Sequence, residues 1–318
     1  MKTTLPSTVF VAALSLFASV HSAYAQTTRW QPAGRRQILL WPSAPPGAKQ
    51  KPDSETAAYA EKPVAGRPWT YISNVSRPTL TVYSPKGINT GAAVMVFPGG
   101  GYQILAIDLE GTEICDWLTS KGITCVLLKY RVPHGGPSYQ GDCDCMINPK
   151  PAPAVQDAQR AMGIIRLHAA EWKINPHKIG VIGFSAGGHL VAAISNDWQK
   201  RLYRPIDEAD RQSARPDFAI TLYPGHLWQK TDDPLAFNRD LHVTAKTPPT
   251  FMVHAQNDSV DNPNHTLSYY AQLRRAAVPV ELHIFAEGGH AFGLRRTKYP
   301  ITEWPAIVEK WMRTIGVL

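Results

Sequence analysis

The sequence predicts an α/β protein in which helices cover both faces of a mostly parallel sheet. Apolar runs of strand length alternate with stretches of helical periodicity from residue 79 to the end of the 318-residue chain. One strand, at residues 179–184, runs directly into a Gly-x-Ser-x-Gly motif centred on Ser185. Two later strands are each followed by a polar loop, and these loops contain Asp258 and His290. Because parallel strands end at one edge of a sheet, the same observations predict a catalytic site at that edge.

The individual elements follow from the pattern of apolar residues. Besides the strand at 179–184, apolar runs predict strands at 79–83, 92–97, 123–129, 218–223, 250–255 and 280–285. Helical spacing of apolar residues predicts helices at 110–121, 155–172, 263–277 and 302–315, and a further helix directly after Ser185. The run at 123–129 is almost continuously apolar, as expected of a strand that is buried on both faces. Residues 26–78 are rich in proline, and we expect Trp30, Trp41 and Trp69 to pack over an edge of the core.

The distribution of basic residues along the chain argues against a nucleic-acid-binding protein. The 33 Lys and Arg residues exceed the 25 Asp and Glu residues, which gives a formal net charge of +8. The basic residues are scattered, and no basic stripe is interleaved with aromatic residues.

The first residues have the pattern of a secretory signal peptide. Lys2 precedes an apolar run at residues 9–20, and Ala23-Tyr24-Ala25 has the small-x-small form of a cleavage site. The run is too short to span a bilayer, and no other stretch is long and apolar enough. We therefore expect a signal peptide at 1–25, a single domain at 26–318, no membrane span, and export to the periplasm or the medium.

The four cysteines are Cys115, Cys125, Cys143 and Cys145. Export permits disulfides, but a direct bond between Cys143 and Cys145 would be strained, and the sequence does not determine which residues pair. No second pair of Cys or His residues has ligand spacing, so no metal site is predicted.

Ser185 is the predicted nucleophile. A Gly-x-Ser-x-Gly motif between a strand and a helix forms a sharp turn that exposes the serine, and Gly183 and Gly187 allow the two backbones to approach closely. The amide of Ala186 then lies at the positive end of a helix, where it can bind an oxyanion.

The predicted base is His290, which lies in a glycine-flanked loop after the strand at 280–285. The acid should follow the preceding strand. Asp258 is the first choice because it is nearest to the strand end, and Asp261 is the alternative. Each aspartate could instead only form a turn, since Asp is common in loops.

The remaining oxyanion donor is predicted in the loop after the strand at 92–97. Three consecutive glycines, residues 99–101, leave backbone amides facing a cavity, and we assign Gly100 or Gly101 to act with Ala186. A phosphate-binding loop is not supported, because no Gly-Lys-Ser/Thr follows.

Residues with other predicted roles lie on loops and helices near these motifs. Tyr102, His134 and Tyr139 are candidates for substrate contact, because they lie on loops that could cover the pocket. We expect Asp157 to favour the start of its helix through the helix dipole.

Together these motifs resemble the α/β-hydrolase superfamily. Over roughly residues 75–318 the chain looks like exported esterases of the acetyl-xylan-esterase-like and feruloyl-esterase-like type, which are related to dienelactone hydrolases. The motifs that carry this resemblance are Phe97–Tyr102, Leu128–Pro133, Asp157–Ala161 and Gly183–Leu190. Two features depart from the pattern: Pro98 stands where many relatives have His, and an insert carries Cys143 and Cys145.

The resemblance implies an ester hydrolase without a cofactor, acting on acylated plant polysaccharides or small esters. By the same resemblance Ser185 is the nucleophile, Asp258 the acid and His290 the base. A serine peptidase of the prolyl-oligopeptidase type shares this order of residues, but such enzymes usually carry an N-terminal propeller, and here only residues 26–78 precede the first predicted strand. A non-catalytic binding protein on the same scaffold is the third possibility, although no member of the triad is missing.

Overall fold

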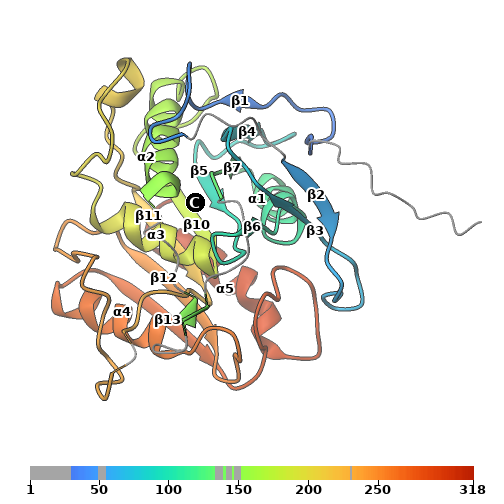
Figure 1. The fold of residues 1–318 in the computed structure, drawn as a ribbon, viewed down its shortest axis with the longest axis vertical. Coiled ribbons are helices and arrows are strands. Elements are labelled where there is room, and N and C mark those ends of the chain that lie inside the picture. The colour runs from blue at the N-terminus through green and yellow to red at the C-terminus, as the bar shows by residue number, and fades with distance from the viewer. Residues whose placement is uncertain (1–29, 49–54, 133–138, 141–144, 147–151, 230) are drawn as a thin grey trace, which may run out of the picture.

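An eight-stranded sheet forms the centre of the molecule (Figure 1). The computed structural model describes residues 30–48, 55–132, 139–140, 145–146, 152–229 and 231–318. The strand order is β1-β4-β7-β5-β10-β11-β12-β13. Neighbouring strands from β7 to β13 are parallel, whereas β4 is antiparallel to both β7 and β1. The prediction of an α/β-hydrolase fold with a mostly parallel sheet is confirmed.

The elements have the following bounds. The central sheet contains β1 (Ile38–Leu39), β4 (Thr79–Tyr83), β5 (Ala93–Phe97), β7 (Thr124–Lys129), β10 (Ile179–Phe184), β11 (Phe218–Leu222), β12 (Thr250–Ala255) and β13 (Val280–Phe285). The helices are α1 (Glu113–Ser120), α2 (Ala152–Leu167), α3 (Ala186–Asn196), α4 (Asn264–Arg275) and α5 (Trp304–Thr314). A π-helix, η1 (Asp108–Thr112), precedes α1, and two 3₁₀ helices are η2 (Glu208–Arg211) and η3 (Pro300–Glu303). A second sheet has the order β2 (Thr56–Tyr59), β3 (Thr70–Ser73), β6 (Ile104–Leu105), and β8 (Tyr139–Gln140) pairs with β9 (Cys145–Met146).

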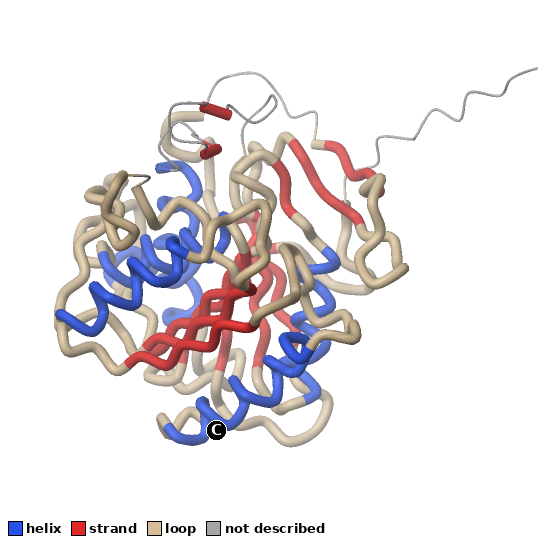
Figure 2. The backbone as a smooth tube through the Cα atoms, turned by 90° about the horizontal axis from the view of Figure 1, so that it is seen from below, coloured by secondary structure: helices blue, strands red, loops and turns tan. Residues whose placement is uncertain are grey.

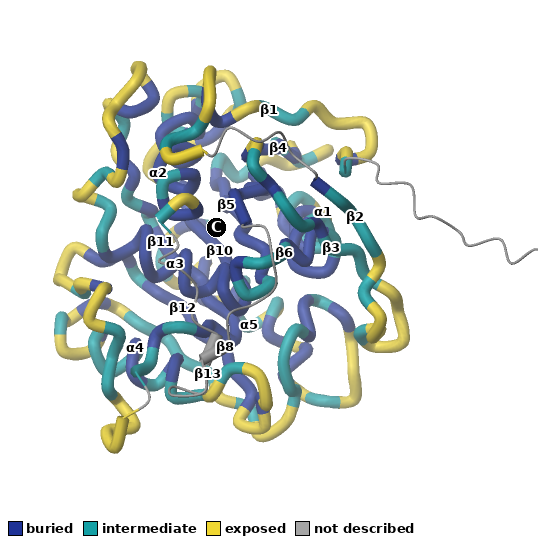
Figure 3. Tube along the Cα trace, viewed as in Figure 1, coloured by how far each residue is buried: buried dark blue, intermediate teal, exposed yellow. Residues whose placement is uncertain are grey.

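Helices cover both faces of the central sheet (Figure 2). On one face, α3 packs on β10 and β11 and contacts α2, and Asn196 at the end of α3 bonds Tyr269 of α4. On the other face, α1 and α5 lie together, since the Trp117 and Trp304 rings are 5.4 Å apart and Lys121 pairs with Glu309. Every residue of β5, β7, β10, β11 and β12 is buried, which explains their almost continuous apolar sequences. Figure 3 shows this buried centre and the exposed loops around it.

The predicted strands are found, whereas two helices differ from the prediction. The helix predicted at 110–121 is divided into η1 and α1, and the carboxylate of Asp108, the first residue of η1, accepts bonds from the amides of Thr70 and Leu109. The helix predicted at 155–172 is α2, which begins earlier and ends at Leu167. The small sheet of β2, β3 and β6 was not predicted, because its short strands pair mainly with one another and lack a long apolar run.

A disulfide joins α1 to β7. It links Cys115 to Cys125, a pairing that the sequence left open. Cys143 lies outside the described residues, and Cys145 is described only as part of β9.

A buried ion pair fastens the N-terminal segment to the sheet and to α2. The Asp157 carboxylate accepts bonds from the indole of Trp41 at 2.8 Å and from the amide and side chain of Arg131 at 2.9–3.0 Å. The Arg131 guanidinium also donates to the carbonyls of Pro46 and Pro153. The expected role of Asp157 at the helix dipole is therefore wrong: its charge is compensated by Arg131 instead.

We expect Asp157→Ala to lower the free energy of unfolding by about 3–5 kcal/mol, because it leaves the Arg131 guanidinium buried without its charged partner. Urea denaturation of the purified protein measures this change.

Glu208→Ala is the matched control. Glu208 and Arg211 form an exposed pair, with side chains 64% and 76% exposed, and such pairs contribute less than about 1 kcal/mol. Equal losses of stability in the two variants would contradict the role assigned to Asp157.

Candidate active site

Ser185 occupies a strained turn between β10 and α3. Its backbone has φ 52° and ψ −120°, a conformation that non-glycine residues rarely adopt and that is concentrated at functional sites. The turn requires close backbone contacts: a Cβ atom on Gly183 would lie 2.1 Å from the carbonyl oxygen of Gly187, and one on Gly187 would lie 2.1 Å from that of Phe97. Both glycines are thus needed for the close packing that the sequence predicted.

His290 and Asp258 meet at the carboxyl edge of the sheet. Nδ1 of His290 lies 2.7 Å from Oδ2 of Asp258, so Nδ1 carries a proton and Nε2 has its lone pair available. Asp258 also accepts bonds from the amides of Val260 and Asp261 and from Nε2 of His254 at 3.2 Å. Of the two aspartates that the sequence left open, Asp258 is the one that contacts Nδ1 of the histidine.

Asp261 lies on the other side of the imidazole. The Ser185 hydroxyl donates to Oδ2 of Asp261 at 3.2 Å, and the same oxygen is 3.8 Å from Nε2 of His290. The structure therefore brings together all four residues that the sequence proposed as nucleophile, base and acid. The serine hydroxyl faces the second carboxylate.

Three carboxylates raise the pKa of the His290 imidazole. Burial by itself would lower the pKa of this imidazole, but the hydrogen bond to Asp258 and the negative charges of Asp261 and Glu110 raise it above the ordinary value. Burial opposes ionisation of Asp258 as well, yet the hydrogen bonds from His254 and His290 lower its pKa below the ordinary value. The pair is therefore poised as an anionic acid that orients a basic imidazole.

The glycine loop after β5 is folded as a tight turn. Gly100 and Gly101 have φ values of 125° and 60°, and the carbonyl of Gly100 accepts bonds from the amides of Gln103 and Ile104. Across from this loop, the amide of Ala186 is the first in α3, and first-turn amides have no acceptor within their own helix. The assignment of Gly100 or Gly101 with Ala186 as oxyanion donors stays a prediction.

Glu110 is a residue of this region that the sequence analysis did not identify. Its buried carboxylate accepts the amide of Gly99 at 2.7 Å and the hydroxyl of Tyr223 at 2.9 Å. The Tyr223 hydroxyl accepts the amide of Gly293, and the Tyr223 ring packs against the ring of His290 with centroids 4.9 Å apart. Glu110 thus connects the glycine loop to the histidine loop. The one signal in the sequence that could have identified Glu110 is its place between Leu109 and Gly111, at the start of the predicted helix.

Burial raises the pKa of Glu110, against the opposing effects of His290, Tyr223 and the Gly99 amide. Burial similarly raises the pKa of Tyr223.

The residues predicted to contact substrate are only partly described. Tyr102 is 2% exposed and its hydroxyl lies 2.7 Å from Nδ1 of His189, so the side chain is buried and does not project as a roof, and its contact with substrate stays a prediction. The His226 ring lies beside both of these rings. Burial lowers the pKa of His189 to about 3, which keeps this imidazole neutral. His134 and the side chain of Tyr139 lie outside the described residues.

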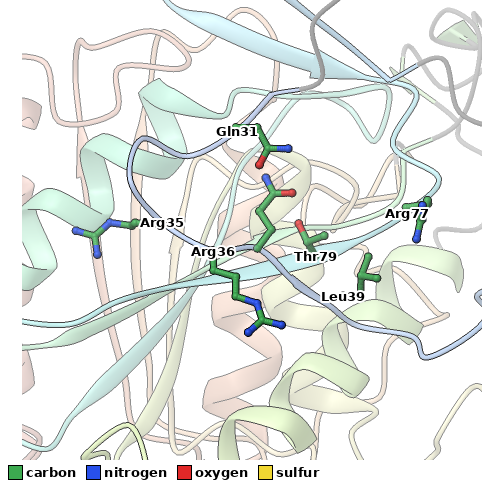
Figure 4. Close-up of a pocket in the computed structure, with 7 residues that line it drawn as sticks. Gln31, Arg35, Arg36, Leu39, Arg77 and Thr79 are labelled. Atoms are coloured by element: carbon green, nitrogen blue, oxygen red, sulfur yellow. The ribbon is translucent and has the colours of Figure 1, made fainter.

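A separate hollow lies beside β1 and β4, and Figure 4 shows that its three arginine side chains point away from one another. It is lined by Gln31, Arg35, Arg36, Gln37, Leu39, Arg77 and Thr79. The residues of the candidate active site take no part in it.

The described ranges contain neither a metal-binding cluster nor a membrane-spanning helix. No group of three or more His, Cys, Asp or Glu side chains there is arranged to hold a metal ion. No helix in the same ranges is long and apolar enough to cross a bilayer.

A strand–serine–helix turn beside a histidine–aspartate pair, at the carboxyl edge of a mostly parallel sheet, defines an α/β hydrolase. Within this class the chain belongs to the prolyl oligopeptidase family, whose sequence pattern matches residues 116–315.

Of the similar proteins, one is named an acetylxylan esterase and another a xylanase. The chain is 30% identical to an acetylxylan esterase of Xylanibacter ruminicola over 70% of its own length and 45% of that protein. It is 25% identical to endo-1,4-beta-xylanase B of Butyrivibrio fibrisolvens, over 65% of its own length and 33% of that protein. It thus spans less than half of the length of these two relatives.

A similar solved structure is the acetyl ester-xyloside bifunctional hydrolase from Caldicellulosiruptor lactoaceticus. It aligns with a TM-score of 0.67 and 28% identity, covering 89% of this chain and 97% of that one.

We expect covalent labelling of Ser185 by a fluorophosphonate to depend on the protonation of His290. The neutral imidazole is the active form and its pKa is raised, so the labelling rate should increase with pH through a midpoint above about 6.5. Stopped-time labelling across the pH range measures this, and a rate that does not change between about pH 5 and pH 9 would contradict it.

Glu110→Gln should slow the same labelling about tenfold. The Gly99 amide and the Tyr223 hydroxyl donate to different oxygens of the Glu110 carboxylate, and in glutamine one of these oxygens is replaced by an NH2 group that cannot accept a bond, so the glycine loop loses support. Glu208→Gln is the control, since the Glu208 side chain is 64% exposed and pairs with Arg211. Equal labelling rates in wild type and Glu110→Gln would show that this contact does not position the loop.

Proposed function

We propose that this protein is a serine carboxylic-ester hydrolase that removes acetyl groups from acetylated carbohydrates. The observation that carries the proposal is the 2.7 Å contact between His290 and Asp258 beside the turn that presents Ser185. The printed names of the acetylxylan esterase and of the acetyl ester-xyloside hydrolase support acetylated carbohydrate as the substrate class. Feruloylated carbohydrates and small esters are the other classes that the sequence resemblance implies.

Acylation begins when the Ser185 hydroxyl turns from Asp261 toward His290. Nε2 takes the hydroxyl proton as Oγ bonds to the ester carbonyl carbon, and Asp258 stabilises the imidazolium that forms. The amide of Ala186, together with that of Gly100 or Gly101, donates to the oxyanion. The ester C–O bond then breaks, and the leaving alcohol takes the proton from Nε2.

Deacylation repeats these steps with water as the nucleophile. Nε2 of His290 removes a proton from water as the oxygen attacks the acyl carbon. The bond to Oγ breaks, Ser185 recovers the proton, and the carboxylic acid leaves.

A peptidase is the second candidate, because the matching family pattern is that of the prolyl oligopeptidases. An amide nitrogen must be protonated before it can leave, whereas an alkoxide leaves more readily. Turnover of a prolyl 4-nitroanilide at a rate comparable to that of an aryl acetate would favour this candidate, and its absence would remove it.

Export is part of the proposal. Residues 1–25, which lie outside the described ranges, have the signal-peptide pattern, and residues 26–318 are proposed to form one domain. The Cys115–Cys125 disulfide supports an oxidising compartment outside the cytoplasm. N-terminal sequencing of the protein recovered from an expressing cell should begin at Gln26.

We expect Ser185→Ala to reduce acetate release from acetylated xylan by about 10⁴-fold or more, because the variant lacks the nucleophile while the fold is retained. Acetate is measured enzymatically against a blank without protein. Ser213→Ala, in an exposed loop before β11, is the control and should act like wild type.

Equal acetate release by wild type and Ser185→Ala would exclude the proposed nucleophile. Hydrolysis of aryl acetates without any acetate release from xylan would restrict the activity to small esters.

A further inference from the structure

Asp261 is a charged residue at the candidate active site that the proposed reaction does not use. Its Oδ2 accepts the Ser185 hydroxyl at 3.2 Å and lies 3.8 Å from Nε2 of His290, while Asp258 occupies the other side of the imidazole. The Asp261 side chain is 16% exposed, so it can still be reached from solvent. The Asp261 carboxylate therefore lies next to Ser185 Oγ and His290 Nε2, the two atoms between which the proposed reaction moves a proton.

The position of Asp261 is fixed by its surroundings. Its amide donates to Asp258, and its carbonyl accepts Nε2 of His254 at 3.0 Å, so the backbone is held on both sides. The side chain fits against Gly225, where an added Cβ atom would lie only 2.6 Å from Oδ1. The absence of a side chain at residue 225 therefore leaves space for this carboxylate next to Ser185.

The direction of proton transfer shows which half of the ester Asp261 would meet. The leaving oxygen must receive its proton from Nε2 of His290, so the alcohol half of the ester must approach that nitrogen. Because Oδ2 of Asp261 is 3.8 Å from Nε2, on the side of Ser185, it lies beside the alcohol and not behind the imidazole.

We propose that Asp261 selects the alcohol half of the ester: its carboxylate accepts a hydrogen bond from a hydroxyl next to the ester oxygen, as a sugar or another polyol presents, and it disfavours alcohols with an anionic group there. This inference rests on the proposed ester hydrolysis and deepens it by naming the property of the alcohol that the site recognises.

The exchange of hydrogen bonds explains the preference. Ser185 must leave Asp261 in order to give its proton to His290, and the carboxylate then loses a donor. A hydroxyl on the alcohol replaces that donor, whereas an alkyl group leaves the carboxylate without it. An anionic alcohol would place a second negative charge next to the first in a partly desolvated site, and this repulsion slows its reaction.

Two matched pairs of acetate esters test the proposal. Glycerol 1-acetate and propyl acetate differ in the hydroxyls of the alcohol, and methyl 2-acetoxybenzoate and 2-acetoxybenzoate differ in a negative charge beside the ester. Values of kcat/KM are measured for wild type, Asp261→Asn, Asp261→Ala and the control Glu287→Gln. Glu287 is an exposed residue of the histidine loop, so the control removes one charge without changing the contact with Ser185.

We expect wild type and Glu287→Gln to favour glycerol 1-acetate over propyl acetate, and the neutral benzoate over the anionic one, by about tenfold each. Asp261→Asn should still hydrolyse the neutral esters and should lose most of the discrimination against the anion. Asp261→Ala should lose the preference for the hydroxylated alcohol, through a higher KM for glycerol 1-acetate.

The pH profile distinguishes this role from a purely structural one. The acidic groups that face His290 are Asp258, Asp261 and Glu110, and the Tyr223 ring packs beside it. Removing the charge of Asp261 leaves the other two, so in Asp261→Asn the acid limb of kcat/KM for propyl acetate should move to lower pH. Thermal unfolding of each variant confirms that it is folded.

The outcomes separate the two proposals. Wild type that hydrolyses no ester in either pair and releases no acetate from acetylated xylan would overturn the proposed function together with this inference. Wild type that hydrolyses the neutral esters, with both preferences unchanged in folded Asp261→Asn and Asp261→Ala, would overturn the inference alone.

Discussion

The site depends on the close approach of strand β10 and helix α3 on either side of Ser185. The absence of side chains at Gly183 and Gly187 allows the backbone to turn within a few residues, and that turn holds Ser185 in a conformation that is unfavourable for a residue with a Cβ atom. The surrounding sheet stabilises this conformation: β10 is a central strand, buried along its whole length and hydrogen-bonded to β5 and β11. The strain is therefore supported by a fully buried strand paired on both sides, and Ser185 lies at the edge where the loops of Asp258 and His290 converge.

The structure also contains several carboxylates removed from solvent, and each has different hydrogen-bond or ion-pair partners. Asp258 is ionised because histidines and amides bond to it, whereas the ionisation of Glu110 is opposed by burial. Asp157 pairs with Arg131 and fastens the N-terminal segment. Asp261 differs from these three, since its carboxylate faces the Ser185 hydroxyl and is partly open to solvent. Burial and partners, and not residue type, thus separate structural acids from those that can act on a substrate.

The similarity to known proteins does not decide whether this chain acts on esters or on amides. The family pattern is named after peptidases, while the similar proteins include an acetylxylan esterase and an acetyl ester-xyloside hydrolase. A shared fold and a shared order of catalytic residues do not distinguish esters from amides, since both reactions use the same nucleophile and base. The side chains around Ser185, Asp261 in particular, are where this chain can differ from its relatives.

The sequence by itself determined the parallel strands, the turn at Ser185 and the loops that contain Asp258 and His290, because apolar periodicity and glycine spacing are local properties. It could not choose between Asp258 and Asp261, which are three residues apart on one loop, since only the path of that loop decides which carboxylate contacts Nδ1 of His290. It also could not reveal Glu110, whose partners Gly99 and Tyr223 are 11 and 113 residues away. Nor could it pair Cys115 with Cys125, or assign Asp157 to Arg131. These features depend on contacts between distant segments, and such contacts exist only once the chain has folded.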